Sequence, residues 1–260
     1  MTVHWSVDHT HNHHAKSDFT AELLGCLARA YASGVPSCGQ RSAYAVLVNY
    51  SNGARRAAAE RGQTSLAFGS ASIERRRGGG HVRYEVHYNN DSSGEQLELE
   101  FAARDAPLRP LTDSWRIHAR NNAGDHYKCF TASGYLHTAT DSQTAELTVD
   151  CRLTFEIGRV QLNVPLVCNW ALFDAVGAIA HGRNPVEGFA ILDDLEKLKP
   201  DIRVRLLGHC TLPLGDTKLP LTGCAVLGRG EPPTYWWTDA HGNVALMSTV
   251  YRTFVLKEMA

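Results

Sequence analysis

The stretch HVRYEVHYNNDSSGEQLELEF, residues 81–101, decides the fold class of this chain. Apolar and polar side chains alternate strictly in HVRYEVHY and again in EQLELEF, which is the period of a strand with one buried face. The intervening NNDSSG is rich in turn-forming residues. The stretch therefore predicts a β-hairpin and favours a sheet of antiparallel strands joined by short turns.

The same alternation continues along the chain. SWRIHAR, residues 114–120, repeats it, and residues 147–157 place six apolar side chains in strict alternation, which predicts one long strand. Strand patterns resume after residue 200, and the chain closes with a predicted hairpin whose turn is DAHGN, residues 239–243. We therefore expect antiparallel strands over 69–160 and closing strands over 201–257.

Helical spacing appears in two other regions. Phe19, Leu23, Leu24, Leu27 and Tyr31 recur at the helical period, and an Ala-rich pattern follows over 42–61, whose first half fits a strand equally well. We expect a helical N-terminal segment over 1–68. Two further helices are expected over 166–198, the second beginning at Asn184-Pro185 and ending at Pro200, with Phe189, Leu192 and Leu195 on its buried face.

Strands that follow one another in blocks, with helices kept apart from them, are typical of α+β proteins. We therefore predict an α+β fold, in one domain of 260 residues. Its curved, mainly antiparallel, half-barrel-like sheet would pack on one or two helices. The closing segment YWWTDAHGNVAL, residues 235–246, resembles the closing hairpin of curved half-barrel sheets in lipoprotein-carrier-like proteins, and the resemblance implies a curved sheet. The first residues, MTVHWSVDHTHNHH, lack the basic start and apolar stretch of a signal peptide, so we expect a departure from that periplasmic family in this respect.

Charge and cysteine usage narrow the function classes. Lys and Arg number 26 and Asp and Glu 27, so the net charge of −1 argues against nucleic acid or a membrane surface as partner. No apolar run reaches 18 residues, and the seven cysteines contain no Cys-x-x-Cys motif. We expect a cytoplasmic protein with reduced thiols. A homo-oligomer is compatible with this composition.

Histidines and carboxylates in the strand region supply candidate acid–base groups. Asp125-His126 follows a plausible turn, and an Asp–His pair is the usual arrangement of an orienting group and a base. Glu85 on the polar face of its strand could orient His87 or His118 for proton transfer near neutral pH. These five residues are the catalytic candidates. A solvated face with cross-strand ion pairs explains the same residues.

Aromatic residues supply a candidate pocket. In Tyr235-Trp236-Trp237 the two tryptophans must point to opposite faces of one strand, so that one meets the core and the other is exposed or lines a cavity. Together with Trp170 and Phe173 they could wall a pocket for an organic ligand. The substrate-binding candidates are Trp115, Tyr127, Tyr235, Trp236 and Trp237. Core packing alone is the alternative.

Three hypotheses follow. The leading one is a cofactor-independent enzyme that performs lyase, isomerase or hydrolase chemistry by general acid–base catalysis on a small apolar or aromatic molecule. The alternative is a non-catalytic protein that binds such a molecule. The third is a metalloenzyme, in which a divalent transition metal binds the histidines of DHTHNHH, residues 8–14. The leading hypothesis includes no metal site.

Overall fold

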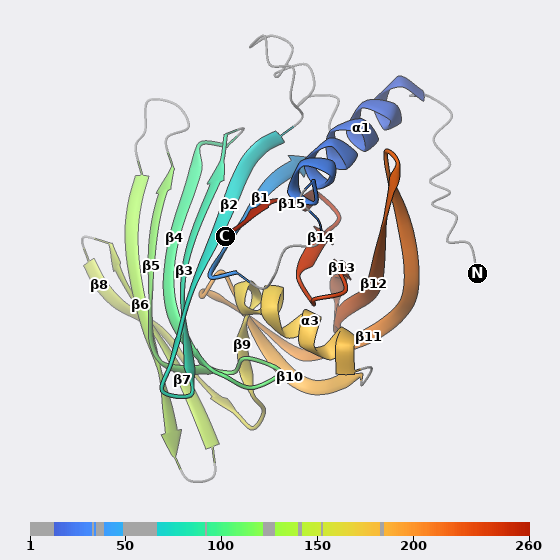
Figure 1. The fold of residues 1–260 in the computed structure, drawn as a ribbon. Helices are drawn as coiled ribbons and strands as arrows, with labels where there is room; N and C mark the ends of the chain where they lie inside the picture. Colours follow the sequence, from blue (N-terminus) through green and yellow to red (C-terminus); the bar gives the residue numbers. More distant parts are fainter. Residues whose placement is uncertain are drawn as a thin grey trace.

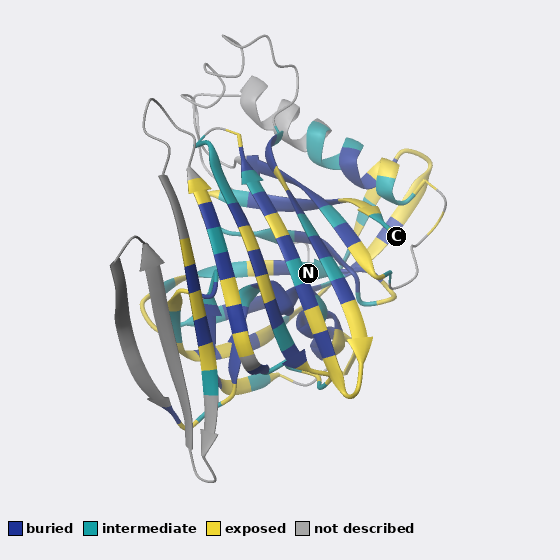
Figure 2. Cartoon of the chain, turned by 90° about the vertical axis from the view of Figure 1, so that its left-hand side faces the viewer, coloured by how far each residue is buried: buried dark blue, intermediate teal, exposed yellow. Residues whose placement is uncertain are grey.

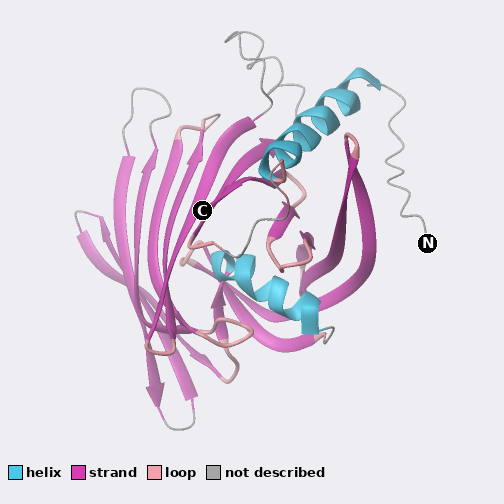
Figure 3. Ribbon diagram, viewed as in Figure 1, coloured by secondary structure: helices cyan, strands magenta, loops and turns pink. Residues whose placement is uncertain are grey.

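Fifteen strands of the described chain form one continuous curved sheet (Figures 1 and 3). The computed structural model describes residues 13–32, 34, 39–48, 67–91, 93–121, 128–139, 142–151, 153–182 and 185–260. The order of the strands in the sheet is β8-β7-β6-β5-β4-β3-β2-β1-β15-β14-β13-β12-β11-β10-β9. Strands that are consecutive in the sequence are neighbours in this order, as short turns produce, except β8 and β9, which stand at its two ends.

Two meanders build this sheet. The first contains β1 (Arg41–Val48), β2 (Ala67–Gly78), β3 (His81–Asn90), β4 (Glu95–Arg104), β5 (Leu111–Asn121), β6 (Lys128–Ala139), β7 (Ser142–Cys151) and β8 (Leu153–Leu162). The second contains β9 (Leu166–Cys168), β10 (Val186–Asp193), β11 (Lys197–Leu214), β12 (Thr217–Gly228), β13 (Glu231–Thr238), β14 (Val244–Ser248) and β15 (Arg252–Met259). All neighbouring pairs are antiparallel except β9 and β10, which are parallel.

The two meanders meet at two places. β1 pairs with β15 over Ser42–Val48, so the first and last strands of the chain lie side by side. At the other end of the second meander, an isolated antiparallel bridge joins Val167 of β9 to Pro110, which immediately precedes β5. The sheet therefore curls back on itself, and β6, β7 and β8 extend beyond the point of contact (Figure 1).

The core lies on the concave side of the sheet. Along β3, Val82, Tyr84, Val86 and Tyr88 are buried, while the residues between them are exposed or half-buried, and Figure 2 shows the resulting bands. Helix α3 (Leu172–Gly182) enters this concave side, preceded by a short 3₁₀ turn, η1 (Asn169–Ala171). Seven of its eleven residues are buried, because an almost wholly apolar helix is stable only inside a protein. Helix α1 (His13–Ala30) instead packs against β15.

The sequence-based α+β prediction is wrong. The described chain consists mainly of strands in one sheet, with one helix inside its curve and one against it. A curved, mainly antiparallel sheet was correctly predicted, as were the hairpin of residues 81–101, its neighbour at 114–120 and the first of the two helices expected over 166–198, which is α3. No helix in the described ranges is long and apolar enough to cross a membrane.

The largest local error concerns the second of the two helices expected over 166–198. Residues 186–199 form β10, a turn and the start of β11 instead, and the four successive buried residues Phe189–Leu192 lie in β10. Gly188 has φ 74°, and Asp194 and Leu195 have φ 48° and 61°. Three left-handed residues within eight positions exclude a right-handed helix, whatever the spacing of the apolar residues.

Two other boundaries also differ from the sequence analysis. Within the expected helical segment 1–68, residues 13–30 are helical, but residues 41–48 form strand β1, which was the open alternative there. The expected single strand 147–157 is divided between β7 and β8, which pair Cys151 with Leu153. Strict alternation fits either one long strand or two strands joined by a very tight turn, so the pattern could not separate them.

Candidate functional site

The predicted acid–base residues lie on the convex face of the sheet. Glu85, His87 and His118 alternate with buried neighbours on β3 and β5, and none of them lines a cavity of the concave side. His87 Nε2 lies 3.1 Å from Glu85 Oε1. Arg120 Nε donates to His118 Nε2 at 2.8 Å, and His118 Nδ1 lies 3.2 Å from Thr131 Oγ1. Both ring nitrogens of His118 thus have protein partners.

The other acid–base candidates lie outside the described residues. These are Asp125 and His126, together with Tyr127, which was proposed to bind substrate. His9 and His11 of segment 8–14 also lie outside the described residues. His13 and His14 belong to α1, but their side chains are not described. Among the described residues, no three His, Cys, Asp or Glu side chains gather closely enough to hold a metal ion.

The predicted aromatic residues separate into two groups. Trp115 lies over Gly134 of the neighbouring strand, and Trp237 lies over Gly223 of its own neighbour. A Cβ atom at either glycine would overlap the indole ring above it. Each indole ring occupies the space that a side chain on the glycine would fill, so both tryptophans have a packing role. Tyr235 is 37% exposed and lines neither cavity of the concave side. Trp236 points inward, as one of the two adjacent tryptophans had to do.

Trp236 belongs to an aromatic cluster around the start of α3. Phe173 lies at its centre, with ring centroids 5.0 Å from Trp236, 5.8 Å from Trp170 and 6.0 Å from Phe254. The Tyr88 ring packs against Trp170 and Phe254, with ring centroids 6.1 and 6.2 Å away. The cluster joins β3, η1, α3, β13 and β15, so residues far apart in sequence meet on one face of the curved sheet.

This cluster walls a cavity of about 360 Å³, which we call the aromatic cavity. Its aromatic lining is Tyr88, Trp170, Phe173, Trp236, Tyr251 and Phe254, and its charged lining is Asp193, Asp194, Lys199, Glu231 and Arg252. Tyr251 is 71% exposed. Apolar walls with a few charged groups are the usual composition of a site for a small organic molecule.

Asp194 is joined to the aromatic wall through Trp170. Its Oδ1 accepts hydrogen bonds from Trp170 Nε1 at 2.7 Å and from Asn169 Nδ2 at 3.0 Å, while Asn169 Oδ1 accepts from the Asp194 backbone N–H at 3.0 Å. Among the described residues, no hydrogen bond to Asp194 Oδ2 is found. Burial, followed by the charge of Asp193, raises the pKa of the Asp194 carboxyl above its ordinary value.

The turn that carries Asp194 is conformationally costly. Asp194 and Leu195 are its central residues, both with positive φ, and Glu196 N donates to Asp193 O at 3.1 Å. A type I′ turn of this kind normally uses Asn-Gly or Gly-Gly. Here Leu195 occupies the second position with its side chain fully buried. The strained turn therefore anchors Leu195 in the core and directs Asp194 into the cavity.

The two bases of the aromatic cavity already have acidic or phenolic partners. Lys199 Nζ lies 2.6 Å from Asp193 Oδ2 and 3.6 Å from Glu231 Oε2. Arg252 Nη1 donates to Tyr88 Oη at 2.5 Å, and its guanidinium carbon lies 5.4 Å from the centroid of that ring. Asp193 and Glu231 therefore each have a basic partner. Among the described residues, Asp194 is the one carboxyl group lining this cavity that has none.

A second cavity, of about 200 Å³, lies along the other side of α3. Its arginine, acidic and histidine lining is Arg75, Arg77, Arg109, Asp174, His181 and His241, and we call it the arginine cavity. Phe173 lines both cavities, so α3 separates an aromatic space from a polar one.

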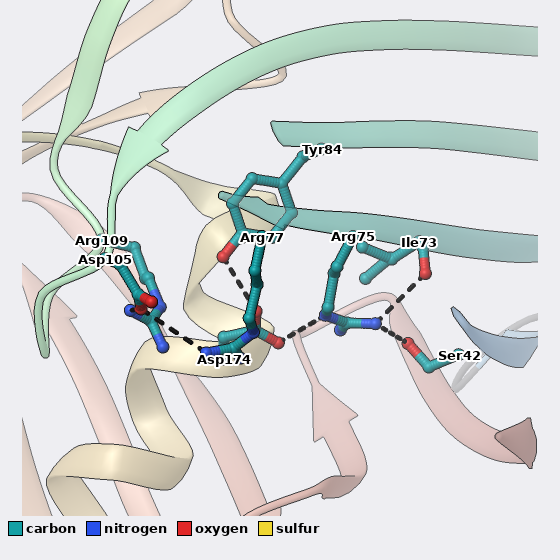
Figure 4. Close-up of polar contacts among 8 residues, drawn as sticks. All are labelled: Ser42, Ile73, Arg75, Arg77, Tyr84, Asp105, Arg109 and Asp174. Atoms are coloured by element: carbon teal, nitrogen blue, oxygen red, sulfur yellow. Dashed lines mark hydrogen bonds and ion pairs between the residues drawn. The ribbon is translucent and has the colours of Figure 1, made fainter. Parts of the chain in front are cut away.

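A buried ion pair forms one wall of the arginine cavity (Figure 4). Arg75 Nε donates to Asp174 Oδ1 at 2.6 Å, and the two side chains are 5% and 9% exposed. Arg75 Nη1 also donates to Ser42 Oγ at 2.9 Å, and Tyr84 Oη donates to Asp174 Oδ2 at 2.8 Å. Burial and the charge of Asp174 raise the pKa of Tyr84, so its hydroxyl remains a donor.

Sequence reasoning missed most of these residues. Asp194 lay within the expected second helix, where an acidic residue has no special meaning, and Asn169 and Arg252 carried no motif. The usable signal was the adjacent pair Asp193-Asp194 directly after the apolar run Phe189–Leu192. A short apolar run followed by turn-forming acidic residues is consistent with a buried strand that ends in a turn.

Comparison with known proteins identifies no family. No protein-family model matches the chain, and no curated protein matches it. Among solved structures, the chain is similar to the crystal structure of a beta-barrel-like protein of the domain of unknown function DUF1849 from Brucella abortus. That similarity has 10% sequence identity and a TM-score of 0.49, and it covers 87% of this chain and 99% of the other.

Proposed function

We propose that this chain binds a small, largely apolar or aromatic molecule in the aromatic cavity. The observation that carries the proposal is the combination of an aromatic wall, formed by Trp170, Phe173, Trp236 and Phe254, with one carboxyl group lacking a basic partner, Asp194. Apolar contact would supply most of the affinity, at roughly 25 cal/mol per Å² of apolar surface removed from water. The carboxyl group would fix the orientation of the ligand.

The orientation step depends on Asp194 Oδ2. Because Oδ1 is held by Trp170 and Asn169, the second oxygen is the one available to a polar group of the ligand. A protonated carboxyl donates a hydrogen bond through that oxygen, and an ionised one accepts. The raised pKa of Asp194 favours the protonated form over a wider pH range than usual.

The test is a titration with N-phenyl-1-naphthylamine, a neutral apolar aromatic whose emission rises in an apolar site and which accepts energy from tryptophan. We expect saturable binding by the wild-type chain and an affinity about tenfold weaker for Trp236→Leu, because the indole supplies much of the apolar wall.

Trp237→Leu is the matched control, since the adjacent tryptophan lies over Gly223 and lines neither cavity. Its affinity should stay within twofold of wild type. Circular dichroism of each variant separates lost binding from lost structure. Absence of saturable binding in the wild-type chain, or equal losses in the two variants, would contradict the proposal.

Acid–base catalysis in the same cavity is the second candidate, and Asp194 favours it. A carboxyl group with a raised pKa beside an apolar surface is the environment that general acids use. The two candidates differ in what happens to the bound molecule. A molecule that co-purifies with the chain and is recovered unchanged after long incubation supports binding alone. Conversion that Asp194→Asn abolishes supports an enzyme.

The cytoplasmic location also remains our proposal. It is supported by Cys26, Cys168, Cys210 and Cys224, which are all free thiols. Burial raises the pKa of Cys168 well above its ordinary value, which keeps this thiol protonated and unreactive. Titration of the denatured chain with a thiol reagent, without reductant, should find seven free thiols, one for each cysteine of the sequence. Disulfides in freshly isolated protein would contradict a reducing compartment.

A further inference from the structure

The arginine cavity contains two guanidinium groups with few protein partners. Arg77 Nη1 lies 3.5 Å from Asp105 Oδ1, and Arg109 Nη1 contacts the same oxygen atom (Figure 4). No other hydrogen bond or ion pair of either guanidinium is found within the described residues. A guanidinium has five N–H donors. Most donors of Arg77 and Arg109 are therefore not satisfied by the described protein.

Arg75 shows the opposite situation. It uses Nε for Asp174 and Nη1 for Ser42 and the carbonyl oxygen of Ile73, all within 3.1 Å. It lies two residues before Arg77 on the same inward face of β2, which is why both reach this cavity. Arg75 is thus fixed by the fold, whereas Arg77 and Arg109 are the arginines that have donors to offer.

Arg109 carries two further signs of a binding role. Its side chain is only 11% exposed, yet its buried Nε has no hydrogen-bond partner among the described residues. Its φ is 53°, a left-handed conformation that is costly for a residue with a Cβ atom. Buried donors without partners and strained backbone are both rare, and strain gathers at binding sites.

The backbone around Arg109 is held firmly in this conformation. Arg109 N donates to Ala106 O at 2.9 Å, and Asp105 N donates to Gly80 O at 2.9 Å. Arg104 N donates to Pro110 O at 2.8 Å and closes the loop. The loop between β4 and β5 therefore presents Arg109 and Asp105 in fixed positions opposite β2, so the site is formed before any ligand arrives.

The charges of this cluster are unbalanced. Three guanidinium groups, those of Arg75, Arg77 and Arg109, face the two carboxylates of Asp105 and Asp174. His181 and His241 also line the cavity, and no further acidic residue of the described chain does so. The excess is positive, and the charge of Arg109, whose side chain is 11% exposed, is screened by water less than a surface charge is.

We propose that the arginine cavity binds a small oxyanion, a carboxylate or phosphate group, between Arg77 and Arg109. The planar fork of a guanidinium matches the paired oxygens of both groups and forms charge-assisted hydrogen bonds with them. The anion would accept from donors that Asp105 leaves unused and would balance the excess charge. This site is separate from the aromatic cavity and does not depend on the function proposed there.

The test is isothermal titration calorimetry with inorganic phosphate and, separately, with acetate, at constant ionic strength maintained with sodium chloride. We expect one saturable site per wild-type chain. Arg77→Gln should raise the dissociation constant about tenfold or more, because a charge-assisted hydrogen bond is lost. The side chain of Arg77 is 45% exposed, so this variant should fold normally.

Arg76→Gln is the matched control. Arg76 is the neighbour of Arg77 on β2, but its side chain is 75% exposed and belongs to the convex face, where it lies 3.6 Å from Glu85. Removing it changes the net charge equally and should leave the dissociation constant within twofold. Arg109→Gln, checked for folding by circular dichroism, should weaken binding as Arg77→Gln does.

Each result has a definite meaning. Saturable binding of phosphate alone, of acetate alone or of both supports the site and identifies the preferred oxyanion, provided that Arg77→Gln weakens it and Arg76→Gln does not. Absence of saturable binding of both anions to the wild-type chain overturns the proposal. Equal weakening by Arg76→Gln and Arg77→Gln overturns it too, because that result reveals only a general charge effect.

Discussion

Arg75 and Asp174 connect the sheet to the helix that it encloses. Both side chains are nearly inaccessible to water, and each has a second partner, Ser42 for the arginine and Tyr84 for the aspartate. Bringing two charges into the interior is costly, so such a pair contributes little net stability compared with apolar residues of similar size. Breaking the pair is a different matter, because the remaining charge is buried without its partner.

We therefore expect Arg75→Met to lower the free energy of unfolding by about 3–5 kcal/mol. The double variant Arg75→Met/Asp174→Leu should lose less than Arg75→Met alone, since it leaves no buried charge. Arg76→Met, which removes an exposed arginine from the same strand, should change stability by less than about 1 kcal/mol. Urea denaturation measures all three. A loss below about 1 kcal/mol for Arg75→Met would contradict this account.

Asp194 predicts a pH dependence of stability. Because its pKa is raised in the folded chain, the native state binds more protons than the unfolded state between about pH 4, the ordinary Asp value, and the folded pKa. Its contribution to stability is therefore lost as the pH rises through that window. Asp194→Asn keeps an acceptor oxygen for Trp170 and Asn169 and removes the charge.

Relative to wild type, Asp194→Asn should gain stability as the pH rises above about 4, and below about pH 4 the difference between the two proteins should no longer change with pH. Urea denaturation at a series of pH values measures the difference. Asp216→Asn, at an exposed hairpin tip, is the control for the change from Asp to Asn itself. A stability difference between Asp194→Asn and wild type that does not vary with pH would contradict the argument.

At the scale of the element, α3 is held by a close approach to the turn between β13 and β14. A Cβ atom on Gly177 would overlap the carbonyl oxygen of Gly242. His181, one turn later, lies with Nε2 2.7 Å from the carbonyl oxygen of Ala240. Asp239 closes the same turn by accepting from the backbone N–H groups of His241 and Asn243. The helix and the turn therefore share a backbone-to-backbone contact that admits only glycine.

Gly177→Ala should consequently destabilise the chain by about 1–3 kcal/mol, the usual cost of overpacking. In an open helix the same change would stabilise by up to about 1 kcal/mol, so the sign of the effect is the test. At Gly182, also in α3, a Cβ atom would meet no described atom within 4 Å, and Gly182→Ala should be neutral or slightly stabilising. Thermal unfolding of both variants decides between the two outcomes.

Elements with a clear period of apolar residues were predictable from the sequence. Elements that contain residues with unusual backbone conformations were not. The hairpin of β3 and β4 was predicted correctly because apolar and polar residues alternate along both strands and a turn lies between them. Residues 186–199 were wrongly predicted to be helical because Phe189, Leu192 and Leu195 also fit a helical face. The left-handed conformation of Leu195, which decides the matter, has no signature in residue type, and Asp194 offers only the general preference of aspartate for turns.

The candidate site was predictable only in part, for the same reason. The alternation of Trp236 and Trp237 correctly indicated that just one of them faces inward. Which residues meet it there depends on the curvature of the whole sheet and on the path of α3. Asp194 comes from a turn, and Arg109 from a loop with an unusual backbone, so tertiary structure alone brings them to their cavities.

At the scale of the molecule, the order of the strands joins the two halves of the chain. The meander of β1–β8 and the meander of β9–β15 share the central pair β1–β15, in which Ala45 lies opposite Val255. Helix α3 adds a second connection, since Asp174 contacts β2 and β3 while Phe173 contacts Trp236 of β13. Buried residues of both meanders accordingly form one hydrophobic cluster.

This arrangement predicts that the two meanders unfold together. Val255 is fully buried and pairs with Ala45 on one side and Leu246 on the other, so Val255→Pro removes a backbone donor in the centre of the sheet. Pulse-labelling hydrogen exchange across a urea series, read by mass spectrometry, follows peptides from β3–β4 and β12–β13 separately. The urea concentrations at which the two groups of peptides are half unfolded should coincide in the wild-type chain. In Val255→Pro both should fall by the same amount.

Leu207→Pro provides the comparison for this last experiment. Leu207 lies at a bulge of β11, where the register with β12 shifts between Leu206 and Gly208, and its side chain is 46% exposed. Proline is tolerated at bulges, so both midpoints should change little. If Val255→Pro instead lowers the midpoint of one meander and leaves the other in place, the halves are independent folding units. The pair β1–β15 would then be a contact between two domains rather than the centre of one sheet.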